Sequence, residues 1–453
     1  MRKITLSLAV AATVATTGSF AASDLESAFK EGKTSGQIRA FYINRAYDFQ
    51  NGATADYSRD GLALGGKLAY ETAPLHGISA GVAFYTTNKV DNENIVAAKN
   101  DKTLFDGNDD GYTMLGQAYL QGKFGNTTVK IGRQQLDTPL AGSDDARMLP
   151  NLFEAALVMN TDLPGTTLIG THVTRMAYGT FANAYGGGEL ALISGYGADV
   201  SKAGLAQSSY KNGTFQTMGK AALGDTAKDS GVTAAAVIYK GVPNLTLQLW
   251  DYYAHEILNA VYAQADYSWK CLLNPAATMT ASVQYIKESD MHDSADLTSA
   301  PYYALQLAMK AGSFNAAVAY SATGTDSGTS YNGSVLSPWG GMPAFTQGMV
   351  TRHQFFADTT AWKLSAGYNL KDLTSQDITA SAYYTSFKVD SDNSYTKAVT
   401  TTEPGFDIIY NNAGIKNLQL RLRGNFPKDF RKGPTNDETT SWKEYRVIAN
   451  YNF

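Results

Sequence analysis

The chain ends in the sequence WKEYRVIANYNF (residues 442–453), in which apolar and polar side chains alternate up to the last residue. A repeat of two is typical of a β-strand, because successive side chains of a strand point to opposite faces. Soluble domains usually end in frayed, polar residues. We therefore interpret this segment as a strand that stays regular up to Phe453, and its pairing partner must lie elsewhere in the chain.

The same alternation recurs along the whole chain. Clear examples are GLALGGKLAY, TMTASVQYI, YYALQLAMK, WKLSAGYNL and NLQLRLRGNF. We count about eighteen such segments of about ten residues each, a length that fits a tilted strand crossing a bilayer.

The connections between these segments alternate between short and long. The short ones are APLHGI, KFGNTT, DLPGTT, KGVPNLT, NPAAT, KAGSFN, LKDLTSQD and NNAGIKN, and nearly all contain the Gly, Pro, Asn or Asp that tight turns need. The long ones include residues 178–230, 321–358 and 426–441, and only the outer loop near His255 is short. Short turns on one side and long loops on the other predict an all-β protein, a single antiparallel transmembrane barrel of about eighteen strands.

A barrel also explains the regular last strand. A closed single-chain barrel has no edge, so the last strand must pair with the first, SGQIRAFYIN. Tyr451 and Phe453 would then lie in the aromatic girdle at the bilayer interface. The alternatives are a secreted sandwich, which at this length needs two or more domains, and a β-solenoid, which needs a fixed repeat that we do not find.

The first residues, MRKITLSLAVAATVATTGSFAAS, have the layout of a secretory signal peptide, with two basic residues, an apolar run and small residues. A membrane anchor is the alternative, but the apolar run is short and rich in Thr. We expect a signal peptide over residues 1–21, a barrel over residues 22–453 and a location in a bacterial outer membrane. In SDLESAFKEG, Ser23 and Glu26 predict a capped helical turn before the first strand.

Composition and motifs exclude several classes of function. Removing Arg2 and Lys3 takes the formal charge from −4 to −6 (−4 − 2), so nucleic acid is not an expected partner. Cys271 is alone and supports no intrachain disulfide. The sequence GISAG fits a nucleophile elbow, but a turn precedes it and a strand follows it, whereas the elbow needs a strand and then a helix. We expect no enzyme and no cofactor.

Two features of the sequence bear on metal binding, the five histidines and one acidic stretch. The five histidines show no ligand spacing, so a zinc site is not expected. The sequence FDGNDDGY, with Asp106, Asp109 and Asp110 in a long outer loop, is compatible with calcium binding or with a simple solvated loop.

The stretch LDTPLAGSDDARMLPNL (residues 136–152) differs from the other outer loops. It combines apolar anchors and two prolines with Asp144, Asp145 and Arg147. A loop that must bury Leu and Met while satisfying charges is expected to fold inward. As the third long loop of a wide barrel, it would narrow the lumen.

Charged residues at lumen positions are mostly basic. In NLQLRLRGNF the leucines would face lipid, so the alternate residues Arg421 and Arg423 are predicted to face the lumen. The same alternation places Arg446 and Arg39 in the lumen, on strands that become neighbours when the barrel closes. The other lumen cations by parity are Lys67, Lys130, Lys310 and Lys363, against the acids Glu71, Glu154, Asp266 and Glu444. Either the lumen is simply polar, or an arginine track attracts carboxylates, with Asp144 and Asp145 facing it across the constriction.

At four places these residues resemble the OprD-type outer-membrane porins. The segment SDDARMLPNLFEAA resembles the D-[ST]-R-L-L-P-x-x-F-x-G pattern of that family, and DLPGTTLIG resembles the turn that follows. LTLQLWDYYAHEILNAVYAQADYSW is similar to a mid-barrel hairpin, and LQLRLRGNF with KEYRVIANYNF to the closing strands. Ala146 and Ala156 depart from the pattern, in which a hydroxyl residue and a glycine stand.

The resemblance implies an eighteen-stranded channel narrowed by its third loop, with a basic ladder for small carboxylates. It maps Arg147 as the third-loop arginine and Arg421 and Arg423 as ladder members. The expected function is passive diffusion of small hydrophilic solutes, with carboxylates and ions as solutes, outer-membrane lipid as surroundings and a monomer or homotrimer as the assembly. A general porin, and an outer-membrane adhesin or barrel enzyme, remain alternatives.

Overall fold

A computed structural model describes residues 22–52, 55–90, 100–106, 110–181, 212–223, 231–291, 297–299, 301–393, 397–431 and 438–453. The expected signal peptide over residues 1–21 lies outside them. No helix in these ranges is long and apolar enough to cross a membrane.

Within these residues, eighteen strands of eight or more residues form one antiparallel sheet. They are β1 (Lys33–Gln50), β2 (Tyr57–Glu71), β3 (Ile78–Lys89), β4 (Tyr112–Phe124), β5 (Thr127–Gln134), β6 (Leu152–Asn160), β7 (Thr166–Ala177), β9 (Val232–Tyr239), β10 (Leu245–Ala254), β11 (Leu258–Lys270), β12 (Ala277–Asp290), β13 (Pro301–Ala311), β14 (Phe314–Thr323), β15 (Thr359–Asn369), β16 (Ile378–Val389), β17 (Val399–Asn411), β18 (Leu418–Asn425) and β20 (Thr439–Asn452). Two strands of two residues, β8 (Gln216–Thr217) and β19 (Phe430–Arg431), extend the sheet beside β7 and β20.

The helices of the described residues are short. They are α1 (Leu25–Lys30), α4 (Met218–Leu223) and α5 (Lys371–Thr374), with 3₁₀ turns at Lys102–Leu104 (η2), His353–Phe355 (η5) and Ser391–Asn393 (η6). The capped turn before the first strand is present as α1, but the prediction of Ser23 as its cap was wrong. Asp24 is the N-cap and exchanges hydrogen bonds with Ser27, because the helix begins one residue later than the spacing to Glu26 suggested.

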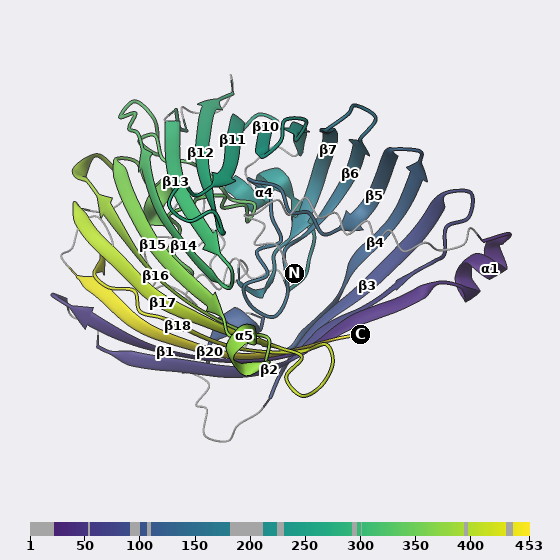
Figure 1. The fold of residues 1–453 in the computed structure, drawn as a ribbon, viewed down its shortest axis with the longest axis horizontal. Helices are drawn as coiled ribbons and strands as arrows, with labels where there is room; N and C mark the ends of the chain where they lie inside the picture. The colour runs from purple at the N-terminus through teal and green to yellow at the C-terminus, as the bar shows by residue number, and fades with distance from the viewer. Residues whose placement is uncertain are drawn as a thin grey trace.

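The sheet closes on itself, as the regular last strand predicted. β1 pairs with β20 from Gln37↔Asn452 to Gln50↔Thr439, and β20 pairs with β18 on its other side. The last residue takes part: the Phe453 N–H donates to the Gly36 oxygen at 3.1 Å, and the Gly36 N–H donates to the Phe453 oxygen at 2.9 Å. Figure 1 shows the strands as one curved wall with β1 beside β20 and α1 projecting beyond it.

The two faces of the wall differ in the way the period of two requires. On β13, Tyr303, Leu305 and Leu307 are exposed on the outer face, whereas Tyr302 and Ala304 are buried on the inner face. An apolar outer band of this kind is typical of a barrel in lipid. The eight predicted short turns all lie at one end, and the other connections lie at the opposite end. The prediction that only the outer loop near His255 is short was wrong, because β1 ends at Gln50 and β2 begins at Tyr57.

Candidate functional site

The third long loop (residues 135–151, between β5 and β6) folds into the barrel. Its apolar anchors Leu136, Leu140, Met148 and Leu149 are all buried. The Leu140 N–H points to the Tyr252 hydroxyl of the facing wall at 3.4 Å. The loop therefore occupies the lumen, as its composition predicted.

The loop between β14 and β15 (residues 324–358) also folds inward and joins the third loop inside the barrel. The Gly142 N–H donates to the Trp339 oxygen at 3.0 Å, and Ala141 forms isolated bridges to Trp339 and Gly340. The wall also holds this loop, since the buried Glu403 carboxylate accepts from the Met349 N–H at 2.8 Å. Two loops far apart in sequence thus form one narrowing element.

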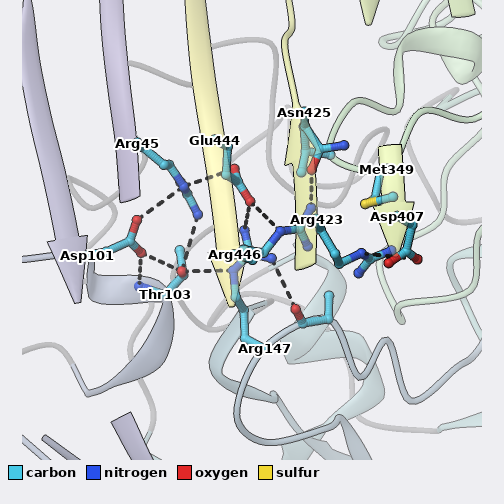
Figure 2. A network of polar contacts seen from close by, with 12 residues as sticks. Arg45, Asp101, Thr103, Arg147, Met349, Asp407, Arg423, Asn425, Glu444 and Arg446 are labelled. Carbon is cyan, nitrogen blue, oxygen red and sulfur yellow. Dashed lines mark hydrogen bonds and ion pairs between the residues drawn. The ribbon is translucent and has the colours of Figure 1, made fainter. Parts of the chain in front are cut away.

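The inner wall of β18, β20 and β1 carries a row of arginines. The register places Arg423 opposite Arg446 and Arg446 opposite Ile43, so the three strands present one continuous face. The arginines of this face are Arg39, Arg45, Arg421, Arg423 and Arg446, and Arg147 reaches it from the third loop. Figure 2 shows Arg45, Arg423 and Arg446 with Arg147 beside them. The four arginines that the sequence placed on one wall therefore do lie on neighbouring strands.

One buried carboxylate joins three of these arginines. Glu444 lies 3.0 Å from Arg147 Nη2, 3.0 Å from Arg446 Nε and 3.1 Å from Arg45 Nε. Arg45 also lies 3.1 Å from Asp101 of the second long loop. The side chains of Arg147, Arg446 and Glu444 are at most 2% exposed. This cluster fastens the third loop to the wall and hides Arg147 and Arg446 from the lumen.

The two remaining arginines of the closing strands are more open. The Arg421 Nε donates to Asp407 Oδ1 at 2.8 Å, and its Nη2 also pairs with the Asp407 carboxylate. The Arg423 Nε lies 3.5 Å from the same carboxylate. Their side chains are 26% and 15% exposed. Because two guanidinium groups share one carboxylate, this pair keeps one positive charge in excess.

Asp144 and Asp145 are not free to face the basic wall across the constriction, and that part of the expectation was wrong. Arg39 binds both Asp145 oxygens, at 2.6 and 2.9 Å, and Arg352 Nη2 binds both Asp144 oxygens at 2.8 Å. The Arg39–Asp145 pair has two parallel N–H···O bonds, and bidentate pairs of that kind are strong and directional. The loop acids therefore neutralise arginines and fix the loop.

The predicted lysine lies apart from the arginine row. Lys130 projects inward from β5, with its Nζ 3.7 Å from the centre of the Tyr119 ring. Lys67 lines a cavity of about 170 Å³ near the Arg39–Asp145 pair, together with Tyr85. The prediction that Glu154 faces the lumen was wrong. Glu154 lies on the same outer face of β6 as the exposed Val158, where it pairs with Arg133.

Four members of the network were not predicted from the sequence. Arg45 lies on the same face of β1 as Arg39, and Asp407 lies on the lumen face of β17. The alternation along each strand would therefore have predicted both. Asp101 and Arg352 lie in long loops, where no periodicity indicates the direction of a side chain.

Residues suggested for other chemistry are placed as structural groups. Ser79 of the GISAG motif lies buried at the start of β3, where its hydroxyl donates to Glu71 at 3.0 Å. The part of the chain that the structure describes has no group of three or more His, Cys, Asp or Glu side chains arranged for a metal ion. Asp109 of the acidic outer loop lies outside the described residues.

One histidine inside the barrel predicts a pH effect. His353, in the loop between β14 and β15, is packed among Phe356, Phe387 and Phe430, and burial lowers the pKa of its imidazole to about 3. An undocked loop would take up a proton below the ordinary pKa of about 6.5, so docking is strongest above that pH and weakens as the pH falls. At about pH 4 the free energy that favours the docked loop over the undocked loop is reduced by about 3 kcal/mol.

We therefore expect the conductance to become larger or noisier as the pH falls below about 6.5, because the loop undocks. His353→Phe should reduce this acid response, and recordings on both proteins at a series of pH values check it. Equal pH profiles for the two proteins would show that His353 does not couple the loop to pH.

A closed antiparallel barrel of eighteen long strands, with an apolar outer band and loops folded into a charged lumen, is the architecture of an outer-membrane porin. The chain belongs to the OprD family of outer membrane porins, because the sequence model of that family matches residues 27–453. A comparison with curated proteins finds no match.

Solved structures show the same fold at low sequence identity. Pseudomonas aeruginosa OpdK with vanillate has a TM-score of 0.71 and 16% identity over 94% of this chain and 99% of that chain. A BenF-like porin of Pseudomonas fluorescens Pf-5 has a TM-score of 0.72 and 16% identity over the same shares. Pseudomonas aeruginosa OccK2 (OpdF) in complex with glucuronate has a TM-score of 0.68 and 15% identity over 94% and 98%.

Proposed function

We propose that this porin lets small hydrophilic solutes diffuse passively through the outer membrane and prefers those that carry a carboxylate. The observation that supports the proposal is the excess of positive charge on the inner wall. The network of Figure 2, extended by Arg421, holds five arginines (Arg45, Arg147, Arg421, Arg423, Arg446) and three acids (Asp101, Asp407, Glu444), a net of +2 (5 − 3). The chain as a whole is acidic.

Within this network we assign the solute contact to Arg423 and Arg421. The Arg423 side chain makes no hydrogen bond to any residue that the structure describes, apart from the 3.5 Å ion pair of its buried Nε, so the other donors of its guanidinium group remain for an incoming carboxylate. A planar guanidinium group binds a carboxylate through two parallel hydrogen bonds. Asp407 limits the strength of that binding, which lets the solute leave again.

We assign a different role to Arg147, Arg446 and Arg39. They are buried and paired with Glu444 or Asp145, so they hold the third loop and contribute a field. Lys67, which lines the cavity beside Arg39 and Asp145, and Lys130, which projects inward from β5, would attract the anion toward the narrow region. Two structural neighbours were solved with vanillate or glucuronate, both carboxylates, which agrees with the proposed class of solute.

The second candidate is a general porin with weak selectivity. It is favoured by the pairing of most lumen arginines with acids, which leaves only a small net charge on the wall. It is also favoured by Ala146, which offers no hydroxyl next to Arg147.

A planar bilayer separates the two. The purified protein is placed in a KCl gradient, the reversal potential is measured, and benzoate is added to one side. Discrete steps, an anion-selective reversal potential and current block that depends on benzoate are expected. Steps without benzoate block would favour the general porin, and an absence of conductance would contradict the channel function.

A further inference from the structure

Two histidines on the outer face of the barrel converge on one oxygen atom. His172 Nδ1 and His255 Nε2 each lie 2.9 Å from the Thr233 hydroxyl oxygen. His172 and Thr233 are register partners on β7 and β9, and His255 lies in the short connection after β10. The centres of the two imidazole rings are 5.8 Å apart, with the rings nearly perpendicular.

These side chains point away from the lumen. Their neighbours Thr171, Val173 and Ala234 are buried on the inner face, whereas Thr233 is exposed and the histidines are partly exposed. The cluster therefore lies at the loop end of the wall, reachable from outside, and is separate from the arginine network of the lumen.

The backbone fixes the positions of both rings. The His255 N–H donates to the Gly231 oxygen at 3.2 Å. Gly231 has a φ of +75°, and a Cβ at this position would lie 3.2 Å from His172 Nε2. The Tyr253 ring packs edge-on against His255 with centroids 4.6 Å apart. Gly231 thus lies against both His172 and His255 and sets their relative positions, so little freedom is lost when both bind one partner.

The shared hydroxyl satisfies the two rings unequally. Thr233 has a single hydroxyl proton, so it donates to one imidazole nitrogen and accepts an N–H from the other. If the exposed Thr233 side chain rotates away, a cation in the vacated position would receive a lone pair from each ring. Metal–nitrogen bonds are about 2.0–2.1 Å, so each nitrogen would move by about 0.8 Å from its present 2.9 Å contact.

We propose that His172 and His255 form a binding site for one borderline divalent cation, of the class Zn²⁺, Ni²⁺ or Cu²⁺, on the outer face of the barrel. Imidazole suits these ions better than Ca²⁺ or Mg²⁺, which prefer oxygen ligands. The site has two protein nitrogens, in agreement with the absence of any three-ligand group among the described residues, and water completes the coordination.

The test is calorimetric titration of the full-length, untagged protein in detergent with Cu²⁺, Ni²⁺ or Zn²⁺ salts alone. We expect about one ion per barrel, with Cu²⁺ bound most tightly as the Irving–Williams order requires. His172→Ala and His255→Ala should each weaken binding at least about tenfold. Thr233→Ala should retain binding, because the ion replaces the hydroxyl hydrogen bonds.

His76→Ala serves as the matched control, since His76 lies in a short turn at the other end of the barrel. Unchanged conductance of each variant shows that the barrel is folded. The proposal is overturned if no saturable binding occurs, or if binding in the His172 and His255 variants equals that in the His76 variant. It is also overturned if Thr233→Ala abolishes binding, which would identify the hydroxyl as the main ligand.

Discussion

Replacing Arg421 and Arg423 together by Ala should reduce the anion preference of the channel by about tenfold. On the inner face of β18 and β20 these two side chains are 26% and 15% exposed, whereas Arg446 is 1% exposed. At an effective dielectric constant of about 40 and a distance of about 10 Å, each charge contributes about 0.8 kcal/mol to the energy of a passing ion. The reversal potential in a KCl gradient should shift toward cation preference, and benzoate block should weaken.

Two controls make this result specific. Lys416→Ala with Lys443→Ala removes the same charge from a short turn and from the outer face, so selectivity should stay near that of the wild type. Asp407→Asn raises the net charge of the same lumen site and should shift the reversal potential in the opposite direction. Unchanged selectivity in the double arginine variant would remove Arg421 and Arg423 from the solute path.

Replacing Glu444 by Gln should lower the free energy of unfolding by about 3–5 kcal/mol. Its carboxylate is buried between Arg45, Arg147 and Arg446, all within 3.1 Å. An amide has the same shape but no charge, so buried guanidinium groups lose their counter-charge, and breaking a buried pair in this way costs about that much. Urea unfolding of the protein in detergent measures the effect.

The matched control is Glu26→Gln in α1, where the Glu26–Lys30 pair is largely exposed. Exposed pairs contribute about 0–1 kcal/mol, so this variant should unfold close to the wild type. Equal effects at Glu444 and Glu26 would show that the buried cluster does not stabilise the loop and wall. A noisier current in Glu444→Gln is also expected, because Arg147 would no longer fasten the third loop.

The sequence by itself determined the barrel. A period of two follows from the pleat of a strand and needs no knowledge of the rest of the chain. Turn residues are likewise selected locally, so the alternation of short turns and long loops was readable before any contact was known. The apolar anchors of the third loop, such as Leu140 and Met148, already indicated burial. Regularity up to Phe453 indicated closure on β1.

The tertiary structure decided how the charges pair. Arg147 and Glu444 are separated by 297 positions in the sequence, and Arg352 and Asp144 by 208. Their contacts depend on the path of two loops inside the lumen, which no local pattern encodes. For this reason the alternation along the strand correctly placed Arg446 on the inner wall, but only the folded loops show that it is buried against Glu444 while 15% of the Arg423 side chain remains exposed.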